Sequence, residues 1–296
     1  MNNTEIIRKI NSFEKWLYQF DLKGNLTPVF KKDRVNRHLQ RKRYFFDPLV
    51  ELFGGSLAGK RVLDLGCNAG FWSLCAIESG CDFVLGVDGR ETNIDQANFV
   101  FEVKEVNKQK YSFILGNIFD LDFKKYGNFD IVLCLGLMYH ISKPMLIMER
   151  ISRVNTDILV IDTLLSRIPG SYLEFRSDNL DNPLSALEYE LVLYPTKQAI
   201  FKMAQQFGYS TVMLKPRFQN YTGALEYKYG FRKAFLCAKK TNLSNLAAKT
   251  ESITLRTQCL DLPMWLARNL ARANISRRLA RILPRKWRAS IDRAFK

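Results

Sequence analysis

The 296-residue sequence is poor in the side chains that build most metal sites. It has two histidines, His38 and His140, and none of its six cysteines forms a Cys-x-x-Cys pair. Structural zinc sites need several such ligands at close spacings, so we expect no metal. Five of the cysteines stand among apolar neighbours, which is typical of reduced, buried thiols, and we expect no disulfide.

Long apolar runs are missing as well. No segment approaches the roughly 18 residues that span a bilayer, and the polar residues 1–5 lack the apolar core of a signal peptide. Hydrophobic residues nevertheless make up 47% of the chain and aromatic residues 12%, which is enough for one large core or two modest ones. We therefore expect a globular, cytoplasmic protein.

Acidic residues are scarce at both ends of the chain. Residues 1–50 contain 11 Lys and Arg against 5 Asp and Glu, residues 51–240 contain 22 against 21, and residues 241–296 contain 12 against 3. This distribution predicts a neutral body at residues 55–240 and a basic helical extension at residues 1–54. A linker and a basic amphipathic tail are expected at residues 241–296.

The sequence of the two basic segments does not decide which partner they bind. Residues 31–43 hold seven Lys and Arg with one acid; such a stripe is usually a solvated helix face and only in a minority of proteins a polyanion site. Residues 263–296 predict two short cationic amphipathic helices, which with Trp265, Trp287 and Phe295 resemble an interfacial anchor as much as a nucleic-acid arm. An anionic membrane surface, contacted peripherally, and RNA are the two candidate partners.

The body alternates between strand and helix patterns. Strands are predicted at residues 61–65, 83–88, 111–115, 129–135, 158–164, 211–215 and 233–238, and helices at 71–79, 92–106, 142–154 and 196–207, the second with a capping box at Thr92 and Asp95. This alternation predicts an α/β fold with a doubly wound, mostly parallel sheet of seven strands. Ligands of such sheets bind beyond the carboxyl ends of the strands.

The first predicted strand runs into a turn with two glycines, Val62-Leu-Asp-Leu-Gly-Cys-Asn-Ala-Gly70. Gly66 permits a positive φ, and Gly70 lets a ligand or the next helix approach closely. Asn68 stands where many such loops have a third glycine, and Asn tolerates left-handed geometry. A dinucleotide fingerprint needs Gly-x-Gly-x-x-Gly, so Asn68 and Phe71 argue against NAD.

Two acids stand near the ends of the first two strands. Asp64 is close enough to the turn to hold an ammonium group, directly or through water, and Asp88 ends the second strand, where a carboxylate can accept both hydroxyls of a ribose. A pyrophosphate would be repelled by Asp64. The ligand that combines a cationic amino-acid end with a ribose is S-adenosyl-L-methionine.

The body resembles a class I S-adenosylmethionine-dependent methyltransferase. The segments that carry the resemblance are Val62 to Gly70, Gly86-Val-Asp88, Gly116-Asn-Ile118 and Phe129 to Gly136. It implies that Gly66 and Gly70 flank the methionine moiety, that Asp88 takes the ribose, and that Asn117 and Ile118 border the adenine. The cofactor-binding residues expected are Asp64, Gly66, Cys67, Asn68, Gly70, Asp88, Gly89, Asn117, Ile118 and Leu135.

A narrower similarity lies in Leu137-Met-Tyr-His140, Ile161-Asp-Thr163 and Leu193-Tyr-Pro-Thr-Lys197. These signals are similar to the group that includes the tRNA wobble-uridine carboxymethyltransferase, which uses carboxy-S-adenosyl-L-methionine. The resemblance therefore makes the carboxy form an alternative donor and a wobble uridine an alternative acceptor.

The residues expected at the acceptor follow from these placements. His140 is a candidate general base or a mere wall of the pocket, and Tyr139 would orient the acceptor. Acceptor contacts are expected from Arg176, Tyr189, Tyr221 and Arg232, with residues 166–194 as a roof.

Three functions remain open. The leading one is methyl transfer to oxygen or nitrogen of a small-molecule or glycolipid acceptor, and the alternative is modification of tRNA. The third, a binding protein without catalysis, is disfavoured by the intact Asp64, Gly66, Gly70 and Asp88.

The cofactor assignment predicts the effect of Asp88→Ala. Charge-assisted hydrogen bonds contribute about 1.5 to 3 kcal/mol each, so loss of the ribose acceptor should weaken cofactor binding at least about tenfold. Calorimetry measures this directly, and an unchanged affinity in the variant would contradict the assignment.

Overall fold

The computed structural model describes residues 1–178 and 190–251, and its centre is an eight-stranded sheet. The strand order is β12-β10-β11-β7-β6-β3-β4-β5. Five neighbouring strands, from β5 to β7, are parallel, whereas β11 runs antiparallel to both β7 and β10. The predicted mostly parallel sheet of seven strands is confirmed, and β12 adds a two-residue edge.

The bounds of the elements are as follows. The strands are β1 (Asp21–Leu22), β2 (Asn25–Leu26), β3 (Arg61–Leu65), β4 (Phe83–Asp88), β5 (Tyr111–Leu115), β6 (Phe129–Leu135), β7 (Asn155–Leu164), β8 (Leu173–Ser177), β9 (Leu191–Pro195), β10 (Ser210–Leu214), β11 (Arg232–Ala238) and β12 (Thr250–Glu251). The α-helices are α1 (Asn3–Ser12), α2 (Asp33–Arg41), α3 (Asp47–Leu52), α4 (Phe71–Glu78), α5 (Glu91–Val103), α6 (Pro144–Val154), α7 (Lys197–Gln206) and α8 (Leu225–Lys228).

The start of α5 differs from its prediction. The helix begins at Glu91, and its N-cap, Arg90, makes no side-chain cap bond, so the capping box predicted at Thr92 was wrong. The turn is fixed instead by Asp88, whose Oδ1 accepts hydrogen bonds from the Arg90 amide at 3.0 Å and from the Asn93 side chain at 2.9 Å. The carboxylate at the end of β4 therefore takes the role that a capping side chain has elsewhere.

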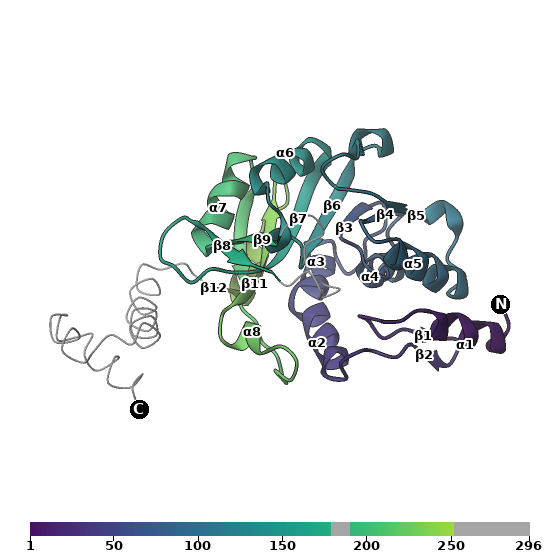
Figure 1. Ribbon diagram of the computed structural model, residues 1–296. Coiled ribbons are helices and arrows are strands. Elements are labelled where there is room, and N and C mark those ends of the chain that lie inside the picture. The colour runs from purple at the N-terminus through teal and green to yellow at the C-terminus, as the bar shows by residue number, and fades with distance from the viewer. Residues whose placement is uncertain (179–189, 252–296) are drawn as a thin grey trace, which may run out of the picture.

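Two hydrophobic clusters pack on opposite faces of the sheet, because neighbouring residues of a strand point to opposite sides. Val62 of β3 belongs to the cluster that includes residues of α4 and α5, and Leu63 to the cluster that includes residues of α6 and α7. Figure 1 shows these two helical layers with the sheet between them. The chain moves outward from β3 to β5 and then returns to β6 on the other side of β3, which opens a crevice at the carboxyl ends of these strands.

The N-terminal residues pack into the same core as α4 and α5. Ile6, Ile10 and Trp16 are buried in that cluster, as are Phe45 and Phe46 of the short π-helical turn that joins α2 to α3. The segment therefore shares its apolar side chains with the sheet domain. Within the described residues, no helix is both long enough and apolar enough to cross a membrane.

The segment between β7 and α7 contains a hairpin. β8 and β9 pair antiparallel, and the Tyr194 ring of β9 lies 5.6 Å from the Tyr139 ring. The tail at residues 263–296 and Tyr189 lie outside the described residues.

Asp64 is a buried carboxylate of the sheet that makes no ion pair among the described residues. Asp64 on β3 is 1% exposed, and its Oδ2 accepts a 2.7 Å hydrogen bond from the Ser73 hydroxyl on α4. Burial raises the pKa of Asp64 to about 7, although the Ser73 hydrogen bond opposes the shift. The folded protein without ligand therefore carries an ionised carboxylate above pH 7 at a cost in stability.

Asp64→Asn should stabilise the ligand-free protein above pH 7, since the amide keeps an oxygen for Ser73 and removes the charge. The gain should be on the order of 3 kcal/mol at pH 8. It should shrink as the pH falls from 7 toward 4, because the wild-type carboxyl then takes up its proton in the folded state. Urea unfolding at several pH values measures the difference, with exposed Glu102→Gln as a control expected to change little. A variant less stable than wild type at pH 8 would contradict the prediction.

Candidate functional site

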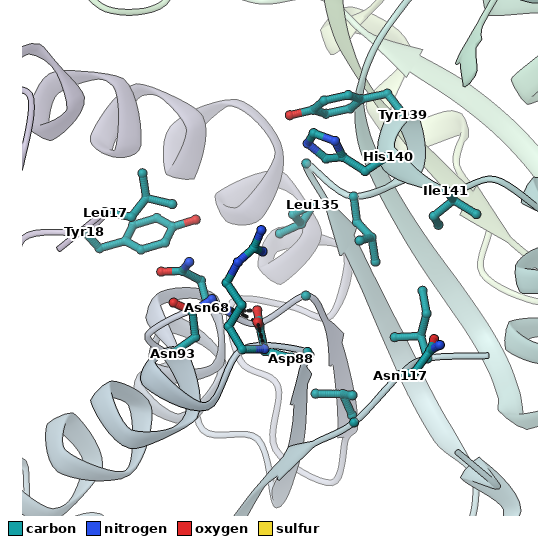
Figure 2. Close-up of a pocket in the computed structure, with 18 of the residues that line it drawn as sticks. Leu17, Tyr18, Asn68, Asp88, Asn93, Asn117, Leu135, Tyr139, His140 and Ile141 are labelled. Carbon is teal, nitrogen blue, oxygen red and sulfur yellow. Dashed lines mark hydrogen bonds between the residues drawn. The ribbon is translucent and has the colours of Figure 1, made fainter. Parts of the chain in front are cut away.

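A cavity of about 440 Å³ opens at the carboxyl ends of the central strands. Its floor includes Asp88, Leu115 and Leu135, the last residues of β4, β5 and β6. Figure 2 shows Asn68, Asp88 and Asn93 gathered at one side of the cavity and Tyr139 and His140 at the opposite side. Its volume lies in the range of small-molecule and cofactor sites.

The turn after β3 has the backbone that its sequence predicts. Gly66 has φ +68°, and Asn68 has φ +49°, so the Asn does adopt the left-handed conformation. Both residues line the cavity. Gly70 has a different role, because a Cβ there would lie 3.1 to 3.2 Å from Phe113, Ala97 and Phe101. It permits close packing of α4 against its neighbours.

Asp88 is held in place by backbone and side-chain donors. The Asn68 amide donates to Oδ2 at 2.9 Å, while Arg90 and Asn93 donate to Oδ1. Oδ2 accepts one of these hydrogen bonds and Oδ1 two, so the carboxylate keeps acceptor capacity, and Asp88 lines the cavity. A fixed carboxylate with spare acceptor capacity is suited to the hydroxyls of a ribose.

The neighbouring wall suits an adenine ring. Ile118 and Leu135 supply apolar surface, and Asn117 and Gly89 also line the cavity. The Asn117 Oδ1 already accepts the Phe119 amide at 3.0 Å, so a second hydrogen bond to it would have to share that oxygen. The apolar side chains and Asp88 together fit the nucleoside part of the expected cofactor.

Not every residue predicted for the site lies on the cavity wall. Asp64 and Cys67 are buried behind the turn, and burial raises the pKa of the Cys67 thiol well above its usual value. Arg176 is exposed on β8 and pairs with Glu174 at 2.9 Å, and the Tyr221 hydroxyl donates to the Pro216 carbonyl at 3.2 Å. Of the four residues predicted for the acceptor, the cavity includes only Arg232 among those described.

His140 and Tyr139 lie at the side of the cavity opposite Asp88, on a short 3₁₀ turn after β6. The His140 Nδ1 lies 2.9 Å from the Asp178 Oδ2, and the two rings of Tyr139 and His140 are 4.0 Å apart. Burial lowers the pKa of His140 to about 4, with Asp178 opposing the shift and Arg232 adding to it. The imidazole is therefore neutral at physiological pH, and the carboxylate beside Nδ1 favours a proton there and a lone pair on Nε2.

The basic stripe of residues 31–43 turns inward, so its interpretation as a solvated helix face was wrong for the core of α2. Arg37, His38 and Arg41 are buried and line the cavity, as does half-buried Arg34. The reason is that acids from distant parts of the chain meet them. Arg37 donates to Glu226 at 2.7 and 3.0 Å, and Arg41 donates to Asp162 at 2.6 Å.

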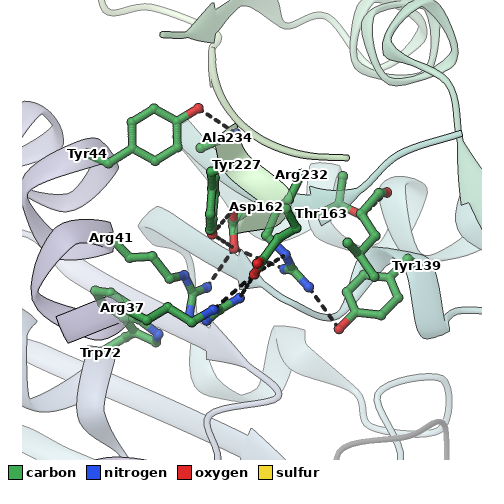
Figure 3. Close-up of polar contacts among 12 residues, drawn as sticks. Arg37, Arg41, Tyr44, Trp72, Tyr139, Asp162, Thr163, Tyr227, Arg232 and Ala234 are labelled. Carbon is green, nitrogen blue, oxygen red and sulfur yellow. Dashed lines mark hydrogen bonds and ion pairs between the residues drawn. The ribbon is translucent and has the colours of Figure 1, made fainter. Parts of the chain in front are cut away.

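Asp162 of β7 is the centre of a polar cluster (Figure 3). Its carboxylate also accepts hydrogen bonds from Tyr227 at 2.8 and 3.0 Å and from Arg232 at 3.2 Å. Burial alone would raise the pKa of Asp162, but Arg41 and Arg232 outweigh it and lower the pKa. Arg232 continues the cluster to the site, because it donates to the Tyr139 hydroxyl at 3.1 Å.

Comparison with known proteins identifies the sheet domain. Residues 56–172 match the family model described as a methyltransferase domain. The ubiquinone biosynthesis O-methyltransferase of Neisseria meningitidis is 30% identical over 140 residues, which cover 47% of this chain and 55% of that protein. The enzyme of the same name from Acinetobacter baylyi is 32% identical over 125 residues, covering 42% of this chain and 51% of that protein.

Residues 56–172 therefore form a methyltransferase domain. The chain spans about half the length of the curated relatives it matches.

Two solved structures share this fold. The N-terminal domain of EvdMO1, crystallised in the presence of S-adenosylhomocysteine and D-fucose, has a TM-score of 0.61 and 22% identity, with 82% of this chain and 98% of that chain covered. Magnesium protoporphyrin IX methyltransferase from Synechocystis, with bound S-adenosylmethionine, has a TM-score of 0.51 and 16% identity, covering 81% and 98%. At these identities the likeness shows the fold alone.

Several residues at the site could not be predicted from their local sequence. The basic stripe includes Arg37, His38 and Arg41. The partner of Arg37, Glu226, is 189 residues away in the sequence, and the partner of Arg41, Asp162, is 121 residues away. Asp178 lies in the segment predicted as the roof, but nothing in its local sequence marks it as a partner of His140. The density of arginines around position 37 was the one usable signal.

Arg41→Met should destabilise the fold strongly. The change leaves the buried Asp162 without its shorter ion pair, and breaking a buried pair costs about 3 to 5 kcal/mol. Lys42→Met is the matched control: its partner is Asp47, both side chains are 38% exposed, and exposed pairs contribute less than about 1 kcal/mol. Chemical denaturation measures both changes, and equal losses would show that the cluster does not hold α2 on the sheet.

Proposed function

We propose that the protein transfers the methyl group of S-adenosyl-L-methionine to an acidic hydroxyl of a small-molecule acceptor. The observation that carries the proposal is that one cavity joins the anchored Asp88 to the Tyr139 and His140 pair. The named relatives are O-methyltransferases, which supports oxygen as the acceptor atom.

The cofactor would lie with its ribose at Asp88 and its adenine between Ile118 and Leu135. When bound, it supplies an electrophilic sulfonium methyl, so the chain has to position the acceptor, exclude water and receive a proton. Asp64 would attract the cationic cofactor through its charge and not by direct contact, because it is buried behind the turn after β3 and does not line the cavity. Its buried charge would be offset when a cationic ligand occupies the turn.

His140 is the group placed to receive the acceptor proton. Its neutral imidazole presents Nε2, while Asp178 holds the other ring nitrogen. An imidazole with a pKa of about 4 is a weak base, and proton transfer to it suits a phenol or enol better than an alcohol. Arg232, through the Tyr139 hydroxyl, favours the negative charge that develops on such an oxygen.

A polyanionic RNA acceptor is less well supported. Arg37 and Arg41, which made residues 31–43 a candidate RNA surface, are buried against Glu226 and Asp162. The tail that could contact RNA or a membrane lies outside the described residues, and its role stays a prediction. A small-molecule acceptor needs only the cavity.

A transfer assay distinguishes these acceptors. The protein would be incubated with methyl-labelled cofactor and, separately, with phenols, sugars, a glycolipid and bulk tRNA, and both S-adenosylhomocysteine and labelled product would be measured. We expect label on a small phenolic acceptor. Labelling of tRNA alone, or transfer of a carboxymethyl group from the carboxy donor alone, would overturn the proposal.

The role of His140 predicts an unusual pH profile. Since the imidazole is protonated only near pH 4, kcat/KM should show no acidic limb from His140 between pH 8 and 5. His140→Gln should lower turnover by about 10² to 10⁴ with the cofactor affinity nearly unchanged.

Asp178→Asn tests whether Asp178 positions the His140 imidazole for catalysis or only supports the fold. It should lower kcat and leave cofactor binding intact, because the carboxylate no longer fixes the imidazole tautomer. Near-normal turnover in His140→Gln would show that His140 is a wall of the pocket. An acidic limb near pH 6.5 that is present in the wild type and lost in His140→Gln would show instead that His140 is the base but has an ordinary pKa.

A further inference from the structure

The end of the cavity formed by α2 and β11 carries more positive charge than the fold neutralises. Arg34, Arg37, Arg41 and Arg232 line it, and the carboxylates that face them are Asp162 and Glu226. Asp33 is exposed at the start of α2, and Asp178 faces His140. Four guanidinium groups therefore meet two carboxylates, of which Asp162 is buried and Glu226 is 26% exposed.

Arg34 makes no ion pair within 4 Å among the described residues, although Glu226 and Asp33 attract it at longer range. Its guanidinium carbon lies 5.8 Å from the Phe30 ring, and burial together with the charge of Arg37 lowers its pKa. A cation that is half-buried beside other cations is stabilised by an anion in the cavity.

Unmet hydrogen-bonding atoms lie at the same end. The Nε atoms of Arg41 and Arg232 are buried and have no hydrogen-bond partner among the described residues, and neither has the Nδ1 of His38. The His38 Nε2 lies 3.0 Å from the Leu17 carbonyl, which favours the proton on Nε2 and leaves Nδ1 as an acceptor. These three atoms are enclosed by neighbouring side chains, so a ligand in the cavity would contact the outer nitrogens of the guanidinium groups instead.

His38 carries no charge at neutral pH, so it neither pairs with Arg34 as an anion nor adds a cation to the cavity. Burial and the charges of Arg41 and Arg37 hold its pKa well below the usual value. It stays neutral, so the positive charge at this end of the cavity comes from the guanidinium groups. The guanidinium groups, by contrast, match the two oxygens of a carboxylate.

We propose that this end of the cavity binds a carboxylate of the acceptor, so that the methyltransferase acts on a hydroxy acid. The inference rests on the proposed function for the position of the reacting hydroxyl, but the anion site has its own test. The methionine carboxylate of the cofactor can engage one guanidinium, and the test is therefore made with that carboxylate already in place.

The experiment uses full-length protein saturated with S-adenosylhomocysteine. Calorimetry first measures binding of S-adenosylhomocysteine, whose failure would count against the proposed function. Benzoate, the neutral isostere benzamide and inorganic phosphate are then titrated into the complex. We expect benzoate to bind at least about tenfold more tightly than benzamide, since a charge-assisted hydrogen bond is lost in the amide.

Arg34→Gln is the informative variant, because its removal leaves no buried carboxylate unpaired. It should weaken benzoate binding about tenfold without changing the affinity for S-adenosylhomocysteine. Lys32→Gln removes the same charge from an exposed position two residues away and should leave benzoate binding within about twofold, since exposed charges are screened.

Four results would overturn the proposal. They are equal binding of benzoate and benzamide, equal losses in the two variants, a preference for phosphate over benzoate, and benzoate binding that disappears once S-adenosylhomocysteine is present. The last would assign the anion site to the cofactor carboxylate.

Discussion

The buried cluster around Asp162 is the interaction on which the second wall of the cavity depends. A carboxylate at the end of β7 is inaccessible to water and accepts from Arg41 of the N-terminal segment and from Arg232 and Tyr227 of the C-terminal part of the domain. A buried carboxylate must be paired or neutralised. Meeting that requirement brings three distant parts of the chain together, and the cavity lies beside their junction.

The same cluster sets the electrostatics of the acceptor side. Arg232 contacts Asp162 on one side and the Tyr139 hydroxyl on the other, and its charge is one reason why the His140 pKa is low. A neutral imidazole in a cationic cavity is a poor proton acceptor for an alcohol, but it suits a hydroxyl whose own acidity the arginines increase. These features support the proposed acidic acceptor.

Local sequence predicted the sheet and its first turn well. The bounds of β3, β4, β5 and β6 match their predictions residue for residue, because each is a short apolar run bounded by polar or turn-forming residues. Asn68 adopts the left-handed conformation that its position after Gly66 indicated. These features depend on residues close in the sequence.

Features that depend on distant partners escaped prediction. The arginines of α2 were predicted to be solvated because their partners, Asp162 and Glu226, are far away in the sequence. The capping box predicted at Thr92 does not form, because hydrogen bonds to Asp88 fix the start of α5 instead. Arg176 and Tyr221 were assigned to the acceptor from their residue type, but the fold uses them in other contacts. Residue type and spacing locate the cofactor side of a site in this fold better than the acceptor side, which several segments build together.

The most direct test of the account is a crystal structure of the protein with S-adenosylhomocysteine. The account predicts ribose hydroxyls within hydrogen-bond distance of Asp88, adenine between Ile118 and Leu135, and the sulfur facing the Tyr139 and His140 side of the cavity. A ligand bound away from Asp88, or with its sulfur turned from His140, would contradict it.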